Sequence, residues 1–289
     1  MRGYMYFLSQ HSVHIEDVYK WFFEEYLRDE FNIEGFIFNG PKHSQSFLEK
    51  CRTLPSEMDG VFKQYSLYVR NHTIDRELLE MSSNPINFAL VPSLINNKYV
   101  YSNSEAIEKE QRLMFSDQTM LGYFPNQGEE YESFFDALSA QDVNISDYPE
   151  LELGGIQWLN ERNVIKIDSS GKIHMNKLRV RLLRDLYKQE VICASYYHDK
   201  TEIEKLIDSE DLRYGSTLFS IPEQHYLNYI LNKSEHSNGL DLRNKYIHST
   251  YPLGEKQQEE DYVTLLKIMA VVILKINEEF CLINSMGNG

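Results

Sequence analysis

The feature that most constrains the fold is a long apolar repeat near the C-terminal end of the sequence. Apolar side chains recur there at intervals of three and four residues, which places them along one side of an α-helix. They are Tyr262, Leu265, Leu266, Met269, Val272, Ile273, Ile276 and Phe280. The preceding Glu259-Glu260-Asp261 suits a helix N-terminus, where negative charge meets the positive end of the helix dipole. Because so wide an apolar face must be covered, we expect this helix at the centre of a bundle.

Helical spacing also marks several segments upstream of this repeat. Helices are predicted from Leu178, Leu182, Leu183 and Leu186, over 202–208, over 224–231 after Pro222, and from Val18, Trp21, Phe22 and Tyr26. The apolar Phe36-Ile37-Phe38 before Asn39-Gly40-Pro41 predicts a short strand and a turn. The expected fold class is mainly α. Its parts are a mostly helical N-terminal region at 1–150, a small segment at 151–177, a helical bundle at 178–284 and a frayed tail at 285–289.

Charge limits the classes of partner. The 289 residues include 44 acids and 29 bases, a formal net charge of −15, and this excludes a surface that binds nucleic acid throughout. The charge is unevenly spread, because 101–150 has eleven acids and two bases whereas 162–188 has eight bases and two acids. We interpret 101–150 as helices joined by a polar loop at 125–128, with a solvated acidic face. The sharper alternative is a mimic of nucleic acid that holds a basic site shut.

Other sequence features narrow the compartment and the cofactors. Cys51, Cys193 and Cys281 are far apart and form no CxxC pair, which argues against a disulfide framework or zinc knuckle and favours the cytoplasm. The longest apolar run, 268–274, is far short of the roughly 20 residues that cross a bilayer. The first residues turn polar too early for a signal peptide. The sequence has no phosphate-binding loop, dinucleotide-binding, HExxH or nucleophile-elbow motif, and so no cofactor is expected.

Two histidines near the start of the chain are three residues apart. His11 and His14 would lie together on a helix. A metal site needs further ligands, and no third ligand stands at a recognisable distance in the sequence. We therefore interpret both as surface histidines and predict no metal site.

A tight hairpin is predicted after helical spacing at 151–159. Residues 164–167 and 172–175 alternate around Asp168-Ser169-Ser170-Gly171, a turn with glycine at its left-handed end. A helix followed by such a hairpin resembles the last helix and wing of a winged helix-turn-helix domain. Basic residues gather here, and six are expected to contact a phosphate backbone: Lys166, Lys172, Lys177, Arg179, Arg181 and Arg184. The alternative is an exposed helix face with ordinary charges.

Three side chains that could carry chemistry lie between the last two predicted helices. A turn at Asn238-Gly239 and a stop at Pro252 bound a short helix. On it Asn244 and His248 are four residues apart and face the same way, and the long side chain of Arg243 can reach the same place.

Arginine, asparagine and histidine together suit metal-free cleavage of RNA. Arginine can grip a phosphodiester in two places, histidine can transfer a proton near neutral pH, and asparagine can orient the imidazole or a phosphate oxygen. In that reaction a base removes the proton of a 2′-hydroxyl, whose oxygen then attacks the adjacent phosphorus. Because the reaction needs a base and an acid, a two-fold dimer would bring two histidines into one cleft.

These residues also resemble a family motif. Leu242-Arg243-Asn244, three residues and His248-Ser249 in a C-terminal bundle resemble the HEPN superfamily (higher eukaryotes and prokaryotes nucleotide-binding), whose signature is Arg, four to six residues and His, commonly with Asn after the Arg. The resemblance covers about residues 178–284. It implies an all-α bundle, a dimer with paired motifs, and in many members a metal-independent endoribonuclease of toxin or phage-defence type, with Arg243, Asn244 and His248 catalytic. Some family toxins are silenced at a tyrosine two residues after the histidine, but this chain has Thr250 there.

The expected function is therefore that of a cytoplasmic, homodimeric, metal-independent endoribonuclease. The basic segment 162–188 would guide RNA, and residues 1–150 would bind an inhibitory or sensor partner; no membrane partner is expected. One alternative is a non-catalytic HEPN-like nucleic-acid-binding regulator whose bundle only dimerises, and another is a protein-binding adaptor that uses 101–150. For the motif itself the alternative is structural. His248 would then satisfy a backbone carbonyl, and Arg243 would pair with Asp241 or with an acid of the final helix.

Overall fold

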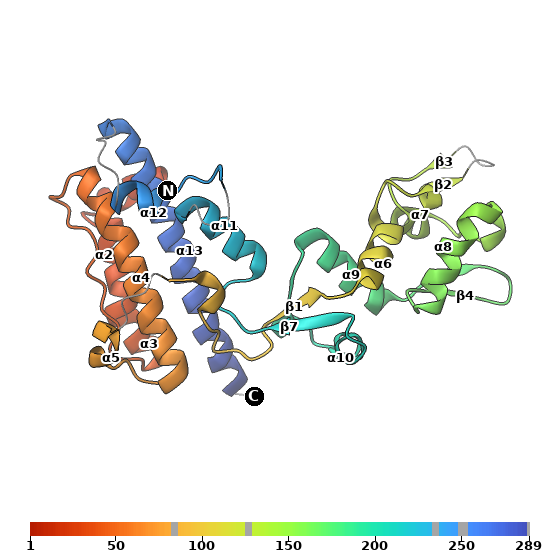
Figure 1. Cartoon of the computed structure of the whole chain (residues 1–289), viewed down its shortest axis with the longest axis horizontal. Coiled ribbons are helices and arrows are strands. Elements are labelled where there is room, and N and C mark those ends of the chain that lie inside the picture. Colours follow the sequence, from red (N-terminus) through yellow and green to blue (C-terminus); the bar gives the residue numbers. More distant parts are fainter. Residues whose placement is uncertain (82–85, 125–128, 233–236, 248–253, 288–289) are drawn as a thin grey trace. The chain divides into compact units, whose positions relative to one another are not determined.

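The chain folds into two compact units (Figure 1). The structure, a computed structural model, describes residues 1–81, 86–124, 129–232, 237–247 and 254–287. The first unit contains residues 1–96 and 216–289, and the second contains residues 97–215. The described residues are mainly helical, as predicted.

The first unit is built from helices at both ends of the sequence. Its elements are α1 (Arg2–Ser9), α2 (Ile15–Trp21), the π-helical turn η1 (Phe22–Tyr26), α3 (Leu27–Phe31), α4 (Phe47–Asn71), α5 (Arg76–Met81), the 3₁₀ turn η2 (Phe88–Leu90), α11 (Ile221–Leu231), α12 (Leu242–Ile247) and α13 (Glu255–Gly287). A capping box fixes the start of α4, in which the Ser46 hydroxyl accepts from the Glu49 amide and the Glu49 carboxylate accepts from the Ser46 amide.

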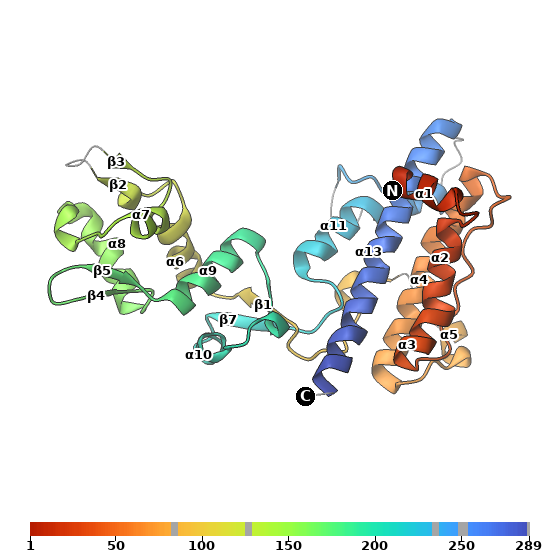
Figure 2. The same ribbon diagram turned by 180° about the vertical axis from the view of Figure 1, so that it is seen from behind.

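Helix α13 lies at the centre of this unit, as the apolar repeat predicts. Figures 1 and 2 show it running between α11 and the helices of the N-terminal part, and it packs along α4. Leu265, Met269, Val272 and Ile276 are completely buried at the expected spacing of three and four residues. The helix continues to Gly287, so the tail expected to fray from 285 is helical as far as that residue.

The predicted strand at Phe36-Ile37-Phe38 is not formed. The amide of Ile37 donates to Oε1 of Gln64 at 2.7 Å, and Nε2 of Gln64 donates to the Ile37 carbonyl at 2.9 Å. One side-chain amide on α4 therefore gives Ile37 the two hydrogen bonds that a neighbouring strand would have given it. Phe36 and Phe38 are both buried in the core of the first unit, which explains the apolar pattern without a strand.

The second unit mixes short helices with small sheets. Its elements are β1 (Tyr99–Ser102), α6 (Glu105–Phe115), η3 (Met120–Gly122), β2 (Tyr123–Phe124), β3 (Glu129–Glu130), α7 (Phe134–Ala140), η4 (Ile145–Asp147), α8 (Glu150–Glu161), β4 (Ile165–Ile167), β5 (Ile173–Met175), α9 (Lys177–Gln189), β6 (Ile192–Cys193), η5 (Ala194–Tyr196), α10 (Thr201–Asp208) and β7 (Leu212–Gly215). One sheet has the order β6-β1-β7 with antiparallel neighbours.

The structure divides the chain differently from the predicted boundaries at 150, 177 and 284. Strands β1 and β7 pair side by side, so the chain enters and leaves the second unit through two adjacent strands. Residues 178–215 therefore share a unit with 151–177, and residues 1–96 complete the bundle instead of forming a separate region.

The hairpin predicted at 164–175 is confirmed. Strands β4 and β5 pair antiparallel, with Ile165 opposite Met175 and Lys166 opposite His174. Gly171 has a φ of +83°, the left-handed conformation expected at the end of this turn. A Cβ at this glycine would come within 2.8 Å of the side chain of Asn144, which gives a second reason for glycine here.

The acidic and basic parts of the sequence meet inside the second unit. Glu110, which is completely buried, accepts hydrogen bonds from Arg162 at 2.6 Å and from Arg179 at 2.9 Å. Arg162 also donates to Asp211 at 2.5 Å, and Ser104 donates to Asp211 at 2.7 Å. This network joins α6, α9, the end of α8 and the start of β7, so part of the charge contrast in the sequence serves folding.

Within the ranges that the structure describes, no helix has the length and apolar character to span a bilayer.

Candidate functional site

Two of the three motif residues, Arg243 and Asn244, lie on α12, a short helix that packs against α4 and α11. Leu242 and Tyr246, four residues apart, are buried in the core of the first unit and anchor the helix. Asp241 has a φ of +52°, and the amide of Leu240 donates to the carbonyl of Tyr229 on α11 at 2.8 Å. The chain is therefore held both directly before α12 and along its apolar face.

Arg243 forms an ion pair with Asp59 on α4. Only 15% of the Arg243 side chain and 20% of the Asp59 side chain are exposed. Burial raises the pKa of Asp59, and this outweighs the lowering effect of Arg243. The structural alternative expected a partner at Asp241 or in the final helix, but the partner lies on α4.

Other side chains of α12 are tied to α13 and α4. Asp261 accepts hydrogen bonds from the Tyr246 hydroxyl and from the Lys245 ammonium, both at 2.7 Å. The Arg52 guanidinium donates to the Tyr246 carbonyl at 3.2 Å. These hydrogen bonds fix the position and rotation of α12 relative to two long helices.

Asn244 differs from its neighbours because its side chain is exposed. It donates to Oδ1 of Asp241 at 2.7 Å, whereas Arg243 reaches in the direction of α4. His248 lies outside the described residues, as do Thr250 and Pro252. The expected convergence of Arg243, Asn244 and His248 therefore stays a prediction.

Basic residues on α4 are a feature of this site that the sequence analysis missed. Arg52, Lys63 and Arg70 are 11 and 7 residues apart, which places them on the helix face that also carries Asp59. We call these three the α4 basic row. The helical spacing of these bases was a usable signal, but the first hundred residues were interpreted from their apolar residues alone.

The far end of the α4 basic row borders a groove of about 560 Å³. Lys63, Ser66 and Arg70 are among its polar residues, and Leu78 and Leu90 are among its apolar ones. Leu90 is 72% exposed, an unusual position for a large apolar side chain. Basic side chains beside an exposed apolar surface suit a single-stranded nucleic acid. The basic side chains would meet its phosphates, and the apolar surface would meet its nucleobases.

In the second unit, three of the six residues predicted to contact phosphate share one face of α9. They recur at intervals of four and three residues, and one more basic residue follows four positions later. All four are exposed: Lys177, Arg181, Arg184 and Lys188. We call these four the α9 basic row. They line a groove of about 560 Å³.

Aromatic rings lie under two arginines of this row. The guanidinium of Arg181 is 5.4 Å from the ring centre of Tyr197, and that of Arg184 is 5.0 Å from the ring centre of Phe135. Such cation–π contacts hold a guanidinium near the protein surface, and its outer N–H groups can still meet a phosphate.

The other three predicted phosphate-binding residues do not join the α9 basic row. Arg179, 3% exposed, points inward to Glu110, because it lies on the same helix face as Leu182, Leu183 and Leu186. The prediction that Arg179 contacts a phosphate backbone is therefore wrong. Lys172 pairs with Asp142 at 2.7 Å, and Lys166 is exposed on the β4–β5 hairpin.

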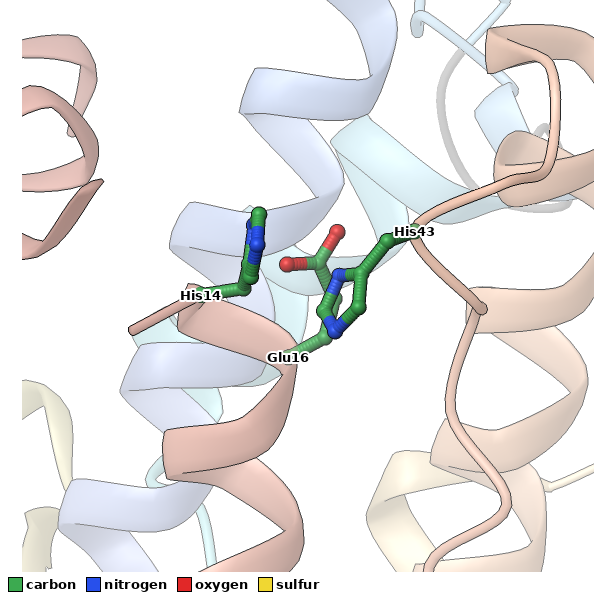
Figure 3. A group of neighbouring side chains, drawn as sticks. All are labelled: His14, Glu16 and His43. Carbon is green, nitrogen blue, oxygen red and sulfur yellow. The ribbon is translucent and has the colours of Figure 1, made fainter. Parts of the chain in front are cut away.

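One group of side chains has the composition of a metal site. His14, Glu16 and His43 place one possible ligand atom each within 4.8 Å of one another (Figure 3). His11 does not share a helix with His14, because His11 lies in the turn after α1 and His14 caps α2. His43, the second histidine of the group, lies in a loop that is distant in the sequence. Sequence spacing therefore did not reveal it.

Comparisons with known proteins give no relative for this chain. No protein-family model, curated protein or solved structure matches it.

Proposed function

We propose that the protein is an endoribonuclease that cleaves single-stranded RNA without a metal ion at α12. The observation that supports this most is the ion pair between Arg243 and Asp59 on the helix face that carries the α4 basic row. The ion pair keeps the charged guanidinium of Arg243 in a fixed position near the α4 basic row, whose side chains suit the phosphates of an RNA strand. The motif of Arg243, Asn244 and His248 also resembles that of the HEPN superfamily, in which arginine and histidine act at paired sites.

Arg243 retains donors for a substrate in this arrangement. A guanidinium has five N–H donors, and Asp59 accepts from NH2 of Arg243. The remaining donors could bind the oxygens of the scissile phosphate, while Lys63 and Arg70 bind phosphates further along the strand. Asn244, exposed and one residue away, would orient the phosphate or the imidazole of His248.

The proposed reaction is an internal displacement at phosphorus. His248 takes the proton of the 2′-hydroxyl, the 2′-oxygen forms a bond to phosphorus, and the bond from phosphorus to the 5′-oxygen breaks. A second acid protonates the leaving 5′-oxygen, and in a two-fold dimer this acid would be His248 of the other copy. The products are a 2′,3′-cyclic phosphate and a 5′-hydroxyl.

Expression in a bacterial host tests this function. We expect the wild-type chain to slow growth and to fragment total RNA, and we expect His248→Ala to abolish both effects at equal protein level. His198→Ala, which removes an exposed histidine of the second unit, is the matched control and should behave as wild type. Intact RNA with the wild-type chain, or equal fragmentation with His248→Ala, would count against the proposal.

A second candidate function is non-catalytic nucleic-acid binding through the second unit. It is favoured by the α9 basic row and its underlying rings, beside a hairpin that resembles a wing and exposes Lys166. In that case Arg181→Glu with Arg184→Glu would abolish binding to duplex DNA, Lys200→Glu would leave it unchanged, and His248→Ala would have no effect on any activity.

A further inference from the structure

A group of two imidazoles and a carboxylate lies at the start of α2, apart from the motif residues. His14 is the N-cap residue of α2, Glu16 lies in its first turn, and His43 comes from the segment before α4. Figure 3 shows the Glu16 carboxylate beside the two imidazole rings. The three possible ligand atoms lie within 4.8 Å of one another. A bound zinc ion lies about 2.0–2.2 Å from each ligand atom, so the three side chains would have to move closer together around it.

Glu16 is prepared as a negatively charged ligand. It is 7% exposed, and its Oε1 accepts hydrogen bonds from the Tyr262 hydroxyl at 2.6 Å and from the Lys50 ammonium at 3.0 Å. The Lys50 ammonium also gives this carboxylate a positively charged partner. Side chains from α4 and α13 therefore fix this carboxylate before any ion arrives.

The two histidines approach from the exposed side. Their rings stack with centres 3.7 Å apart, and imidazole is the commonest metal ligand among protein side chains. Nε2 of His43 lies 3.2 Å from the carboxylate of Asp17. A hydrogen bond from Nε2 to Asp17 leaves Nδ1 of His43 as the ligand nitrogen, and carboxylates hold metal-binding histidines in this way in many proteins.

We propose that His14, Glu16 and His43 bind one divalent transition-metal ion, with Asp17 positioning His43. Two imidazoles and one carboxylate suit Zn²⁺, and they also accept Co²⁺ and Ni²⁺. Water would fill the remaining position, because both histidines are exposed. Mg²⁺ and Ca²⁺ prefer oxygen ligands and do not fit this set. The ion would fasten the segment before α4 to the start of α2, and this role is independent of RNA cleavage.

The test is metal binding by the full chain without a histidine tag, because a tag would bind the same ions. Titration with Zn²⁺ should give one site per chain and raise the temperature of thermal unfolding, since an ion that binds only the folded state stabilises it. Co²⁺ should give the visible absorption of a nitrogen- and oxygen-ligated ion. We expect His14→Ala and His43→Ala each to weaken binding at least tenfold, and Asp17→Asn to weaken it about tenfold to a hundredfold.

His198→Ala is the matched control, because it removes an exposed histidine of the second unit and should leave the affinity for Zn²⁺ unchanged. Circular dichroism of the histidine variants would show that they fold. Absence of stoichiometric Zn²⁺ binding, or binding that survives both His14→Ala and His43→Ala, would overturn the proposal.

Discussion

Arg243 on α12 and Asp59 on α4 are 184 residues apart in the sequence and form a largely covered ion pair in the first unit. This ion pair ties the motif helix to one of the two long helices of the bundle. Two residues of the α4 basic row lie close by, because Arg52 donates to the Tyr246 carbonyl of α12 and Lys63 lowers the pKa of Asp59. The pair is therefore a natural point at which to test the role of Arg243.

Asp59→Asn should release Arg243 while keeping the shape of the side chain. Because burial raises the pKa of Asp59, its ionised form adds no net stability at neutral pH, and we expect Asp59→Asn to cost the first unit little there. Binding of RNA should become tighter, because one negative charge is removed, whereas cleavage should slow, because Arg243 is no longer held. Asp29→Asn, which affects an exposed pair with Arg28 away from α12, is the matched control. Unchanged cleavage by Asp59→Asn would argue against a positioning role.

The raised pKa of Asp59 has a consequence for stability at acid pH. A carboxyl group whose pKa is higher in the folded state takes up its proton more readily there than in the unfolded chain. Its contribution therefore favours folding below the unfolded pKa and is lost as pH rises through the folded pKa. We expect a comparison of wild type with Asp59→Asn by urea unfolding across the acid range to show this loss in the wild type alone. A difference that runs in the opposite direction would contradict the assigned shift.

Charge reversal on α4 tests whether RNA follows the α4 basic row. Lys63→Glu with Arg70→Glu should weaken binding of single-stranded RNA. The slope of log affinity against log salt should become shallower by about 0.7 for each phosphate that the variant no longer neutralises. Lys267→Glu, on the exposed side of α13, changes the charge equally per residue and serves as the control. If the double variant binds RNA as tightly as Lys267→Glu does, the row is not the RNA path.

The buried carboxylate of Glu110 should stabilise the second unit. Glu110→Ala leaves Arg162 and Arg179 without their shared partner, and removing one member of a buried pair costs about 3–5 kcal/mol. Glu108→Ala, at an exposed position of the same helix, should have little effect. Hydrogen exchange measured by mass spectrometry would locate the loss of protection in residues 97–215. Equal protection in both variants would show that the network is not needed for folding.

Much of the local structure could be predicted from the sequence. The spacing of Leu265, Met269, Val272 and Ile276 is sufficient for α13, and the turn ending in Gly171 is sufficient for the hairpin, because these signals depend on neighbouring residues. The division into units could not be predicted in this way. It depends on the pairing of β1 with β7, which no local pattern encodes.

The charged residues were harder to interpret than the apolar ones. Arg179 looks like its basic neighbours in sequence, but its spacing from Leu182 and Leu186 places it on the buried face, where Glu110 binds it. The helical period could have revealed this position, although not its partner. Partners such as Asp59 for Arg243 and His43 for His14 come from distant segments, so they become visible only in the folded chain.

The most direct test of the proposed function is cleavage of a short single-stranded RNA by the purified chain in excess EDTA. The wild type should produce a 2′,3′-cyclic phosphate and a 5′-hydroxyl, and it should not cut at a site that carries a 2′-deoxy nucleotide. Arg243→Ala and His248→Ala should be folded and inactive. Cleavage that persists at the 2′-deoxy site, or in both variants, would contradict the account.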